Sequence, residues 1–320
     1  MKITTKIIAI SILLLTLSCD KEIPNDNNSS SKTITPLALT TTPKKFLFDA
    51  TKAETAGNAD WVLDADTSPQ RFPTPLQSNI TATTTESYWR GGLSSWGIAL
   101  VKLGHSVETL SSGTAITYGG TGAQDLKNYN VFVIDEPNIK FTTAEKTALI
   151  NFVKNGGGLF MISDHTVSDR NNDGWDSPAI WNDLMTTNSV KANPFGFSIT
   201  LNNISETTTN RLSATTNTIL NGSQGTVTQL KYSNGATITT NTAANATVQG
   251  LIWRGTSAQG TSNVMCASAT YGTGRVVVIG DSSPADDGTG ASGDTLYPGW
   301  TELPSHSRLH MNASLWLAKL

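Results

Sequence analysis

Short, continuous apolar runs that end in aspartate recur along this 320-residue chain. Strands that are buried on both faces of a parallel sheet read as unbroken apolar runs, whereas half-exposed strands alternate. Four such runs are present, Lys45–Asp49, Val131–Asp135, Leu159–Asp164 and Arg275–Asp281. They predict a mostly parallel sheet whose strand ends carry Asp49, Asp135, Asp164 and Asp281.

The segments between these runs predict an α/β fold. Thr142 and Glu145 have the spacing of a capping box ahead of an apolar helical stretch, and three glycines at 156–158 end it. Strand, helix and strand then follow with short connections, which is the unit of a parallel sheet. We expect a flavodoxin-like sheet flanked by helices, a β-rich Thr/Asn insertion near 188–245, a hairpin near 264–281 and a C-terminal helix.

The N-terminus has the pattern of an exported lipoprotein. A basic start and a short apolar core precede Ser18-Cys19, which resembles a lipobox, so residues 1–18 predict a signal peptide and Cys19 a lipidation site. The alternative is an ordinary cleaved signal with an incidental cysteine. Residues 19–44 are polar and predict a disordered tether, and 45–320 the folded domain. We expect anchoring to the outer membrane or cell surface through the lipid. Cys266 is expected to be a buried strand residue.

The strand ends predict the functional centre. Ligands of open α/β sheets bind outside the carboxyl ends of the strands, so the four aspartates should face one region. His165 follows Asp164 directly and could serve as a base or ligand. We therefore predict Asp164, His165, Asp281 and Asp49 as the centre. The alternative is that each aspartate only caps a turn or helix.

A divalent cation is a second expectation. Oxygen-bearing side chains alternate before Gly174, as at the start of an EF-hand loop, and predict a calcium site formed by Asp169, Asn171, Asp173 and Asp176. The match is partial because the twelfth position is Ile180, and a plain surface turn is the alternative. His306 is a further metal candidate, since it stands four residues before His310. Asp286 and Asp287 form a second acidic loop of ambiguous role.

Nucleophilic catalysis has weaker support in the sequence. Ser163 and Ser282 lie at strand ends, yet neither has the G-x-S-x-G pattern of a nucleophile elbow. A Ser-His-Asp triad could be assembled from His165 and several aspartates, but the spacing does not select one. His105 follows Gly104 and is expected to be a solvated or capping residue.

Three segments together resemble the class I glutamine amidotransferase-like superfamily, and within it the ThuA-like and related exported domains. They are Phe141–Leu159, with a helix and a glycine run, the turn 217–222, which lacks the family's His and Pro, and the closing hairpin 271–281. The resemblance covers about Phe46 to Leu320 and implies a fold more than an activity. The turn where the amidotransferases carry a catalytic cysteine reads Ser163-Asp164-His165 here, so glutaminase activity is not implied. The ThuA-like branch is associated with sugar utilisation.

Two functions remain open from the sequence. The first is a hydrolase, with or without a metal, that acts on extracellular carbohydrate or ester through Asp164 and His165. The second is a non-catalytic glycan- or ligand-binding lipoprotein with tryptophans such as Trp89, Trp175 or Trp300 exposed as stacking platforms. The net charge of −3 argues against nucleic acid as a partner.

Overall fold

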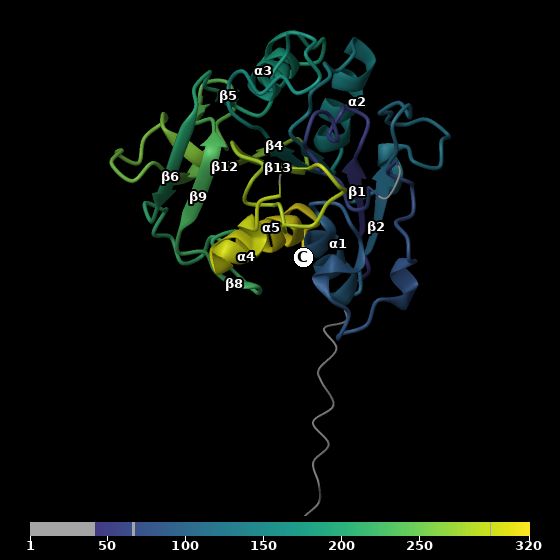
Figure 1. The fold of residues 1–320 in the computed structure, drawn as a ribbon. Coiled ribbons are helices and arrows are strands. Elements are labelled where there is room, and N and C mark those ends of the chain that lie inside the picture. The colour runs from purple at the N-terminus through teal and green to yellow at the C-terminus, as the bar shows by residue number, and fades with distance from the viewer. Residues whose placement is uncertain (1–41, 66–67, 295) are drawn as a thin grey trace, which may run out of the picture. The chain divides into compact units, whose positions relative to one another are not determined.

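A mixed sheet forms the centre of the molecule (Figure 1). The computed structural model describes residues 42–65, 68–294 and 296–320, which belong to one compact unit; Cys19, the predicted signal peptide and most of the predicted tether lie outside them. In order across the sheet, its strands are β2 (Ser106–Leu110), β1 (Lys45–Asp49), β3 (Val131–Asp135), β4 (Gly158–Ile162), β13 (Gly274–Ile279), β12 (Val264–Tyr271), β10 (Ile238–Thr240) and β5 (Phe197–Ile199), with β11 (Gln249–Trp253) also paired to β12.

The kind of strand pairing changes once across the sheet, from parallel to antiparallel. From β2 to β13 all neighbours are parallel, whereas β12, β10, β11 and β5 pair antiparallel. The chain passes from β1 to β2 on one side and then to β3 on the other side of β1, which creates a topological switch point between β1 and β3. Such a point, at the carboxyl ends of the strands, is where open α/β sheets bind ligands.

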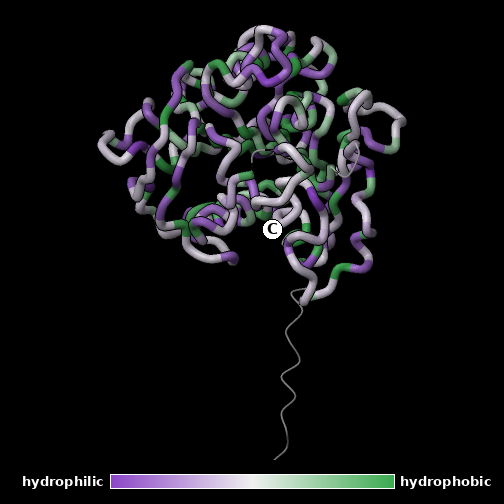
Figure 2. Tube along the Cα trace, viewed as in Figure 1, coloured by the Kyte–Doolittle hydropathy of each residue, from purple (hydrophilic) through white to green (hydrophobic). Residues whose placement is uncertain are grey.

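Helices cover both faces of the sheet and give the molecule three layers. On one face, α1 (Ser94–Lys102) and α5 (Pro304–Leu317) pack onto alternate strand residues such as Phe46 and Phe48. On the other face, α2 (Thr143–Lys154) and α3 (Ser177–Thr186) pack onto the residues between them, such as Leu47. The central strands are thus buried on both sides, which explains their unbroken apolar runs. Hydrophilic stretches dominate the outer loops (Figure 2).

The end of α2 shows how local sequence sets an element boundary. Thr142 caps its first turn through the reciprocal bonds of a capping box with Glu145. After the helix, Gly156 adopts a φ of +113°, and a Cβ on Gly157 would lie 2.3 Å from the Phe152 ring. Only glycine fits both positions, so the helix ends there and β4 begins directly.

The structure confirms the α/β fold class, with a mostly parallel sheet, antiparallel additions and a C-terminal helix. The region rich in Thr and Asn supplies β5, β10 and two small antiparallel pairs, β6 (Ile204–Thr208) with β9 (Leu230–Gly235) and β7 (Asn221–Gly222) with β8 (Gly225–Thr226). Three of the helices and strands were not predicted. The strand β2 lies at the edge of the sheet and contains polar residues, of which Glu108 and Thr109 are buried. The helix α3 has ten residues and is capped by Asp176. A short helix, α4 (Gly299–Glu302), precedes α5.

The capping box generates a stability prediction. Thr142→Ala removes the acceptor for the Glu145 backbone N–H and should lower the free energy of unfolding by about 1 kcal/mol. Urea unfolding with an unchanged m value measures it. The control is Thr143→Ala, because Thr143 is exposed at the first helical position. Equal stability of the two variants would contradict the prediction.

Candidate functional site

Five buried carboxyl groups meet at the carboxyl ends of β3, β4 and β13. We call them the carboxyl cluster: Asp135, Glu136, Asp164, Asp281 and Asp286. The register explains the meeting, because Asp135 pairs with Ile162, two residues before Asp164, and Ile162 pairs with Ile279, two residues before Asp281. Parallel pairing therefore brings the ends of three strands to one place.

Asp164 is the most heavily bonded member of the cluster. It accepts from the Nδ1 of His165 at 2.6 Å and from the Ser282 hydroxyl at 2.9 Å, and its Oδ2 lies 3.5 Å from the Nη2 of Arg170. The hydrogen bond to Asp164 raises the pKa of His165 above its usual value, against the effect of burial. The Asp164 carboxyl group thus lies between an imidazole and a guanidinium.

Glu136 stands directly after β3 in a strained backbone conformation. Its φ is +44°, in the left-handed region that non-glycine residues rarely adopt, and its side chain is fully buried. The carboxylate accepts from the Nε of Arg170 at 2.6 Å, from the Trp61 indole N–H at 2.5 Å and from the Ser282 hydroxyl at 3.2 Å. Burial and the nearby Asp164 raise its pKa, while Arg170 opposes the rise. These contacts fix Glu136 despite the strain.

Asp135 is the member without bonds. Its side chain is 1% exposed, and neither carboxyl oxygen has a hydrogen-bond partner among the described residues. Burial, followed by the charges of Asp164 and Asp281, raises its pKa well above the usual value. A buried carboxylate with no partner is very unfavourable, so Asp135 carries a proton at neutral pH.

The remaining members also favour the protonated form. Burial raises the pKa of Asp281 to about 8 and that of Asp286 to about 7. Arg170 and His165, when it is protonated, supply at most two positive charges to five carboxyl groups. The charges of the cluster therefore balance only when at least three of the carboxyl groups are protonated or when a ligand brings positive charge.

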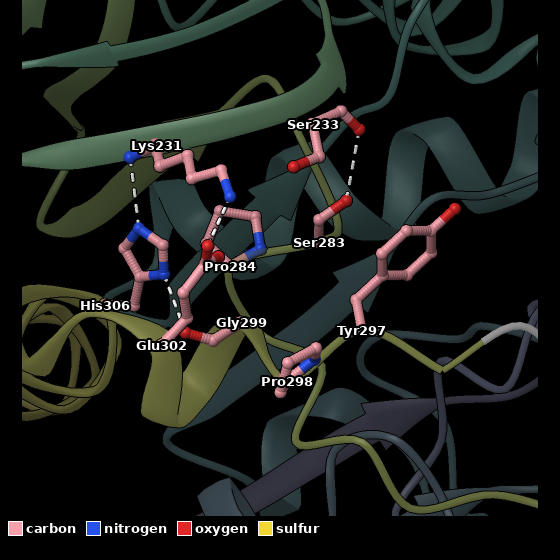
Figure 3. A pocket seen from close by; sticks show the side chains of 9 residues that line it. All are labelled: Lys231, Ser233, Ser283, Pro284, Tyr297, Pro298, Gly299, Glu302 and His306. Carbon is pink, nitrogen blue, oxygen red and sulfur yellow. Dashed lines mark hydrogen bonds and ion pairs between the residues drawn. The ribbon is translucent and has the colours of Figure 1, made fainter.

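A pocket opens beside the cluster (Figure 3). Its volume is about 160 Å³, and its wall is formed by Lys231, Ser233, Ser283, Pro284, Tyr297, Pro298, Gly299, Glu302 and His306. Asp281 joins it to the cluster, because this carboxyl accepts from the backbone N–H groups of Ser233 and Ser283. The pocket thus lies next to groups whose pKa values are displaced, as at many functional sites.

His306 lines this pocket with both ring nitrogens engaged. Its Nδ1 lies 2.7 Å from the Gly299 carbonyl oxygen, and its Nε2 accepts from the Lys231 backbone N–H at 3.0 Å. Burial lowers the pKa of His306, which agrees with a neutral ring that donates through Nδ1. Neither nitrogen has a free lone pair for a metal. His310 is also buried on α5, where its ring packs between Trp96 and Phe160.

Asp49 also lies at the carboxyl ends of the parallel strands, but it belongs to a second carboxyl pair. It accepts from the Thr51 backbone N–H at 3.1 Å and interacts with Glu54, whose pKa burial and Asp49 raise well above its usual value. Burial also raises the pKa of Asp49 to about 6. The structure therefore groups Asp135, Asp164, His165 and Asp281 and places Asp49 with Glu54.

The predicted calcium loop is folded as a turn. Asp169 accepts from the backbone N–H groups of Asp173 and Gly174, and Asp173 from that of Trp175 and from the Asn171 side chain. Asp176 caps α3 and also binds Val167. In the described part of the chain, no three His, Cys, Asp or Glu residues are placed to hold one ion. Calcium binding by this loop stays a prediction from the sequence.

Three further expectations need correction. A Ser-His-Asp triad requires the histidine in the middle, whereas here Asp164 lies between Ser282 and His165.

Trp89 and Trp300 are core residues at 0% and 5% exposure, because they pack beside α1 and α5, and cannot be exposed platforms. Trp175 is half-buried beneath Lys140. His105 is buried against Phe46 instead of solvated. Cys266 is a buried strand residue, as predicted.

Comparisons with known proteins place this geometry in a structural context. No family model and no curated protein matches the sequence. Among solved structures, the N-terminal domain of mmIFT52 is similar with a TM-score of 0.53 at 14% identity, covering 85% of this chain and 97% of that one. The likeness is one of fold alone. It does not carry over what that domain does.

Two bacterial structures are also similar in part. A cytoplasmic protein from Salmonella typhimurium has a TM-score of 0.48 at 12% identity, covering 86% of this chain and 98% of that one. A protein described as ThuA-like from Bacteroides uniformis has a TM-score of 0.43 at 12% identity, with coverages of 86% and 91%. Within the described residues, no helix combines the length and apolar character needed to span a bilayer.

Sequence reasoning missed three residues of the site and its pocket. Arg170 stands within the acidic loop 169–176, where a lone cation gave no sign that it turns inward to Glu136 and Asp164. Glu136 directly follows Asp135 at a strand end, so the position that singled out the aspartate applied to it as well. Tyr297, on the pocket wall, lies in a segment without any recognisable pattern.

A further pair of acidic residues, Asp60 and Asp294, holds the segment that follows β13. Asp60 and Asp294 both accept from the Ala291 backbone N–H, at 3.3 and 2.9 Å, which brings their oxygens together. Burial, and then the charge of Asp294, raises the pKa of Asp60 to about 8. Nearby, Asp287 accepts from the Ser95 backbone N–H in the first turn of α1.

The raised pKa of Asp60 predicts how stability changes with pH. The folded state keeps this proton up to pH 8 or so, whereas the unfolded chain releases it near pH 4, so the contribution to stability is lost as pH rises across that range. Asp60→Asn cannot ionise, and its advantage over the wild type should grow from near zero at pH 4 to as much as about 5 kcal/mol at pH 8, because each unit of pKa shift corresponds to about 1.4 kcal/mol. Thermal unfolding at both pH values measures this difference.

The control for Asp60→Asn is Asp173→Asn, which removes a carboxyl group at an exposed position. Its difference from the wild type should be small at both pH values. An advantage of Asp60→Asn that is the same at pH 4 and pH 8 would show that the carboxyl is not held protonated.

Proposed function

We propose that this chain is a hydrolase of carbohydrate whose acid and base are members of the carboxyl cluster. The observation that carries the proposal is the contrast between two neighbouring carboxyl groups. Asp164 contacts His165 and Arg170, whereas Asp135 is buried without a hydrogen-bond partner among the described residues and has its pKa raised well above the usual value by burial. Neighbouring carboxyls whose environments favour opposite protonation states are how one site supplies an acid and a base at neutral pH.

Glycosidic bonds are the substrate class that this contrast suits best. Their hydrolysis uses one carboxylic acid to protonate the leaving oxygen and one carboxylate as nucleophile or base. In the proposal Asp164 is the carboxylate, with His165 and Arg170 holding its charge and position. A protonated member, Asp135 or Asp281, supplies the acid, and the adjoining pocket receives part of the substrate.

Ester hydrolysis through a serine nucleophile has less support. The Ser282 hydroxyl donates to carboxyl oxygens of Asp164 or Glu136 and does not bond His165, which would have to remove its proton. Catalysis by a cysteine nucleophile has no support at this strand end, because the turn after β4 reads Ser163-Asp164-His165. We therefore propose a glutamine amidotransferase-like domain, as the sequence resemblance implies, that lacks glutaminase activity.

The proposal predicts that Asp164→Asn separates activity from stability. Asparagine keeps the shape and can cap almost as well, but it cannot act as a base, so kcat/KM should fall about 100- to 10,000-fold on any polysaccharide that the wild type cleaves. Stability should change little. Reducing-sugar release from a panel of xylan, mannan, galactan and β-glucan, with and without a chelator, measures the activity.

His165→Ala should reduce the same activity, since it removes one of the two cations beside Asp164. Asp173→Asn in the exposed loop is the matched control and should leave turnover unchanged. Unimpaired turnover in both Asp164→Asn and His165→Ala would reject the proposed centre, and loss of folding in both would assign the pair a structural role.

The site of action is proposed from the N-terminal sequence. We propose that Cys19 is lipidated and anchors the chain to the outer membrane or cell surface, where polysaccharide is met. Cys19→Ser should move the protein from the membrane to the soluble fraction on cell fractionation, because serine cannot carry the lipid that would hold the chain at the membrane after the signal peptide is cleaved. A variant with Ser18→Ala, which keeps a small residue before the cysteine, should stay in the membrane. Retention of Cys19→Ser would refute lipidation.

A further inference from the structure

A second pocket lies at the opposite end of the sheet from the carboxyl cluster. Strand β12 runs antiparallel to β13, and Thr270 pairs with Arg275, near the start of β13, whose other end leads to Asp281. Residues late in β12 are therefore level with the amino ends of the parallel strands. The pocket has a volume of about 230 Å³ and is lined by Thr216, Asn217, Thr218, Ile219, Thr247, Gln249, Ser268, Ala269, Thr270 and Trp316.

The polar groups of this wall are all neutral. They are hydroxyls and side-chain amides, and no Asp, Glu, Lys, Arg or His is among the lining residues. The pocket beside the carboxyl cluster differs, since Lys231, Glu302 and His306 line it. A neutral wall rich in hydroxyls and amides offers donors and acceptors to a ligand without charge and gives an ion no compensating charge.

Some of these groups have no partner in the protein. Ser268 is 6% exposed on β12, and among the described residues no hydrogen bond is made by its hydroxyl. The amide of Gln249, which is exposed at the start of β11, likewise makes none. Ser268 and Gln249 both line the pocket, so the hydroxyl of one and the amide of the other can bond a group that enters it.

Trp316 adds a fixed aromatic wall. The residue stands near the end of α5 and is half-buried. Arg275 holds it, because the guanidinium carbon lies 4.9 Å from the centre of the aromatic ring and Nη1 donates to the Trp316 carbonyl oxygen at 2.5 Å. A ring fixed in this way loses little conformational entropy when a ligand packs against it.

We propose that this pocket binds one sugar residue of a neutral glycan. A pyranose ring presents C–H groups to an aromatic side chain and hydroxyls around its edge, and the pocket combines Trp316 with unpartnered hydroxyl and amide groups. The inference is independent of the proposed hydrolase, because the pocket shares no residue with the carboxyl cluster or with the pocket beside it. It gives the chain a binding site separate from its proposed reaction site.

The test uses the folded chain and defined oligosaccharides. Xylohexaose, mannohexaose, cellohexaose and laminarihexaose are the neutral probes and a galacturonic acid hexamer is the acidic one, with binding measured by calorimetry and saturation-transfer NMR. At least one neutral probe should bind the wild type. Gln249→Ala, at an exposed side chain that leaves the core intact, should weaken its Kd at least 10-fold, and Trp316→Ala should weaken it further.

Two further variants keep the result interpretable. Trp316→Phe retains an aromatic wall and should keep the Kd within about threefold, which separates loss of the ring from loss of folding. Asp164→Asn should bind as the wild type does, even where turnover is lost. The proposal is overturned when no neutral probe binds, when only the acidic hexamer binds, or when binding survives both Gln249→Ala and Trp316→Ala.

Discussion

The buried ion pair between Arg170 and Glu136 ties together the part of the molecule where function is concentrated. Glu136 is fully buried, so its charge depends on the guanidinium, which also reaches Asp164 and bonds Asn58 at 2.9 Å. Three segments distant in sequence thereby converge on one side chain. Breaking a buried pair of this kind by removing one partner costs about 3–5 kcal/mol, because the other charge is left uncompensated. The strained backbone at Glu136 and the position of the loop 169–176 both rest on this contact.

The fold was predictable where burial leaves a strong pattern. Strands covered on both faces must be apolar throughout, which made β1, β3, β4 and β13 visible, and the capping box located the start of α2. The edge strand β2 could not be predicted because it is only five residues long and Ser106 and Glu108 interrupt its apolar pattern. Glu108 is buried there and accepts hydrogen bonds from Arg71 and Tyr129, which the sequence does not reveal. The helix α3 was hidden because its capping residue, Asp176, had been interpreted as a calcium ligand.

The candidate site was predictable only as far as strand order determines it. Residues that follow parallel strands lie at the same end of the sheet, so the meeting of Asp135, Asp164 and Asp281 follows from the sequence. What neutralises them does not follow, since the direction in which the Arg170 side chain points depends on the tertiary fold of an irregular loop. The same reason applies to Asp49, which joins Glu54 through the local turn at 50–54. A sequence pattern predicts where the backbone places an acidic residue more readily than it predicts which side chain its carboxyl group will contact.

The helix α5 runs between the two pockets. His306, near its first turn, lines the pocket beside the carboxyl cluster, and Trp316, near its last, lines the neutral pocket. Ten residues separate them, which corresponds to about 15 Å along a helix axis. A helix is stiff along its length, and this one is packed against α1 and the sheet. One packed helix therefore contributes a side chain to each pocket, so the distance between the two binding sites is set by the length of α5 between His306 and Trp316.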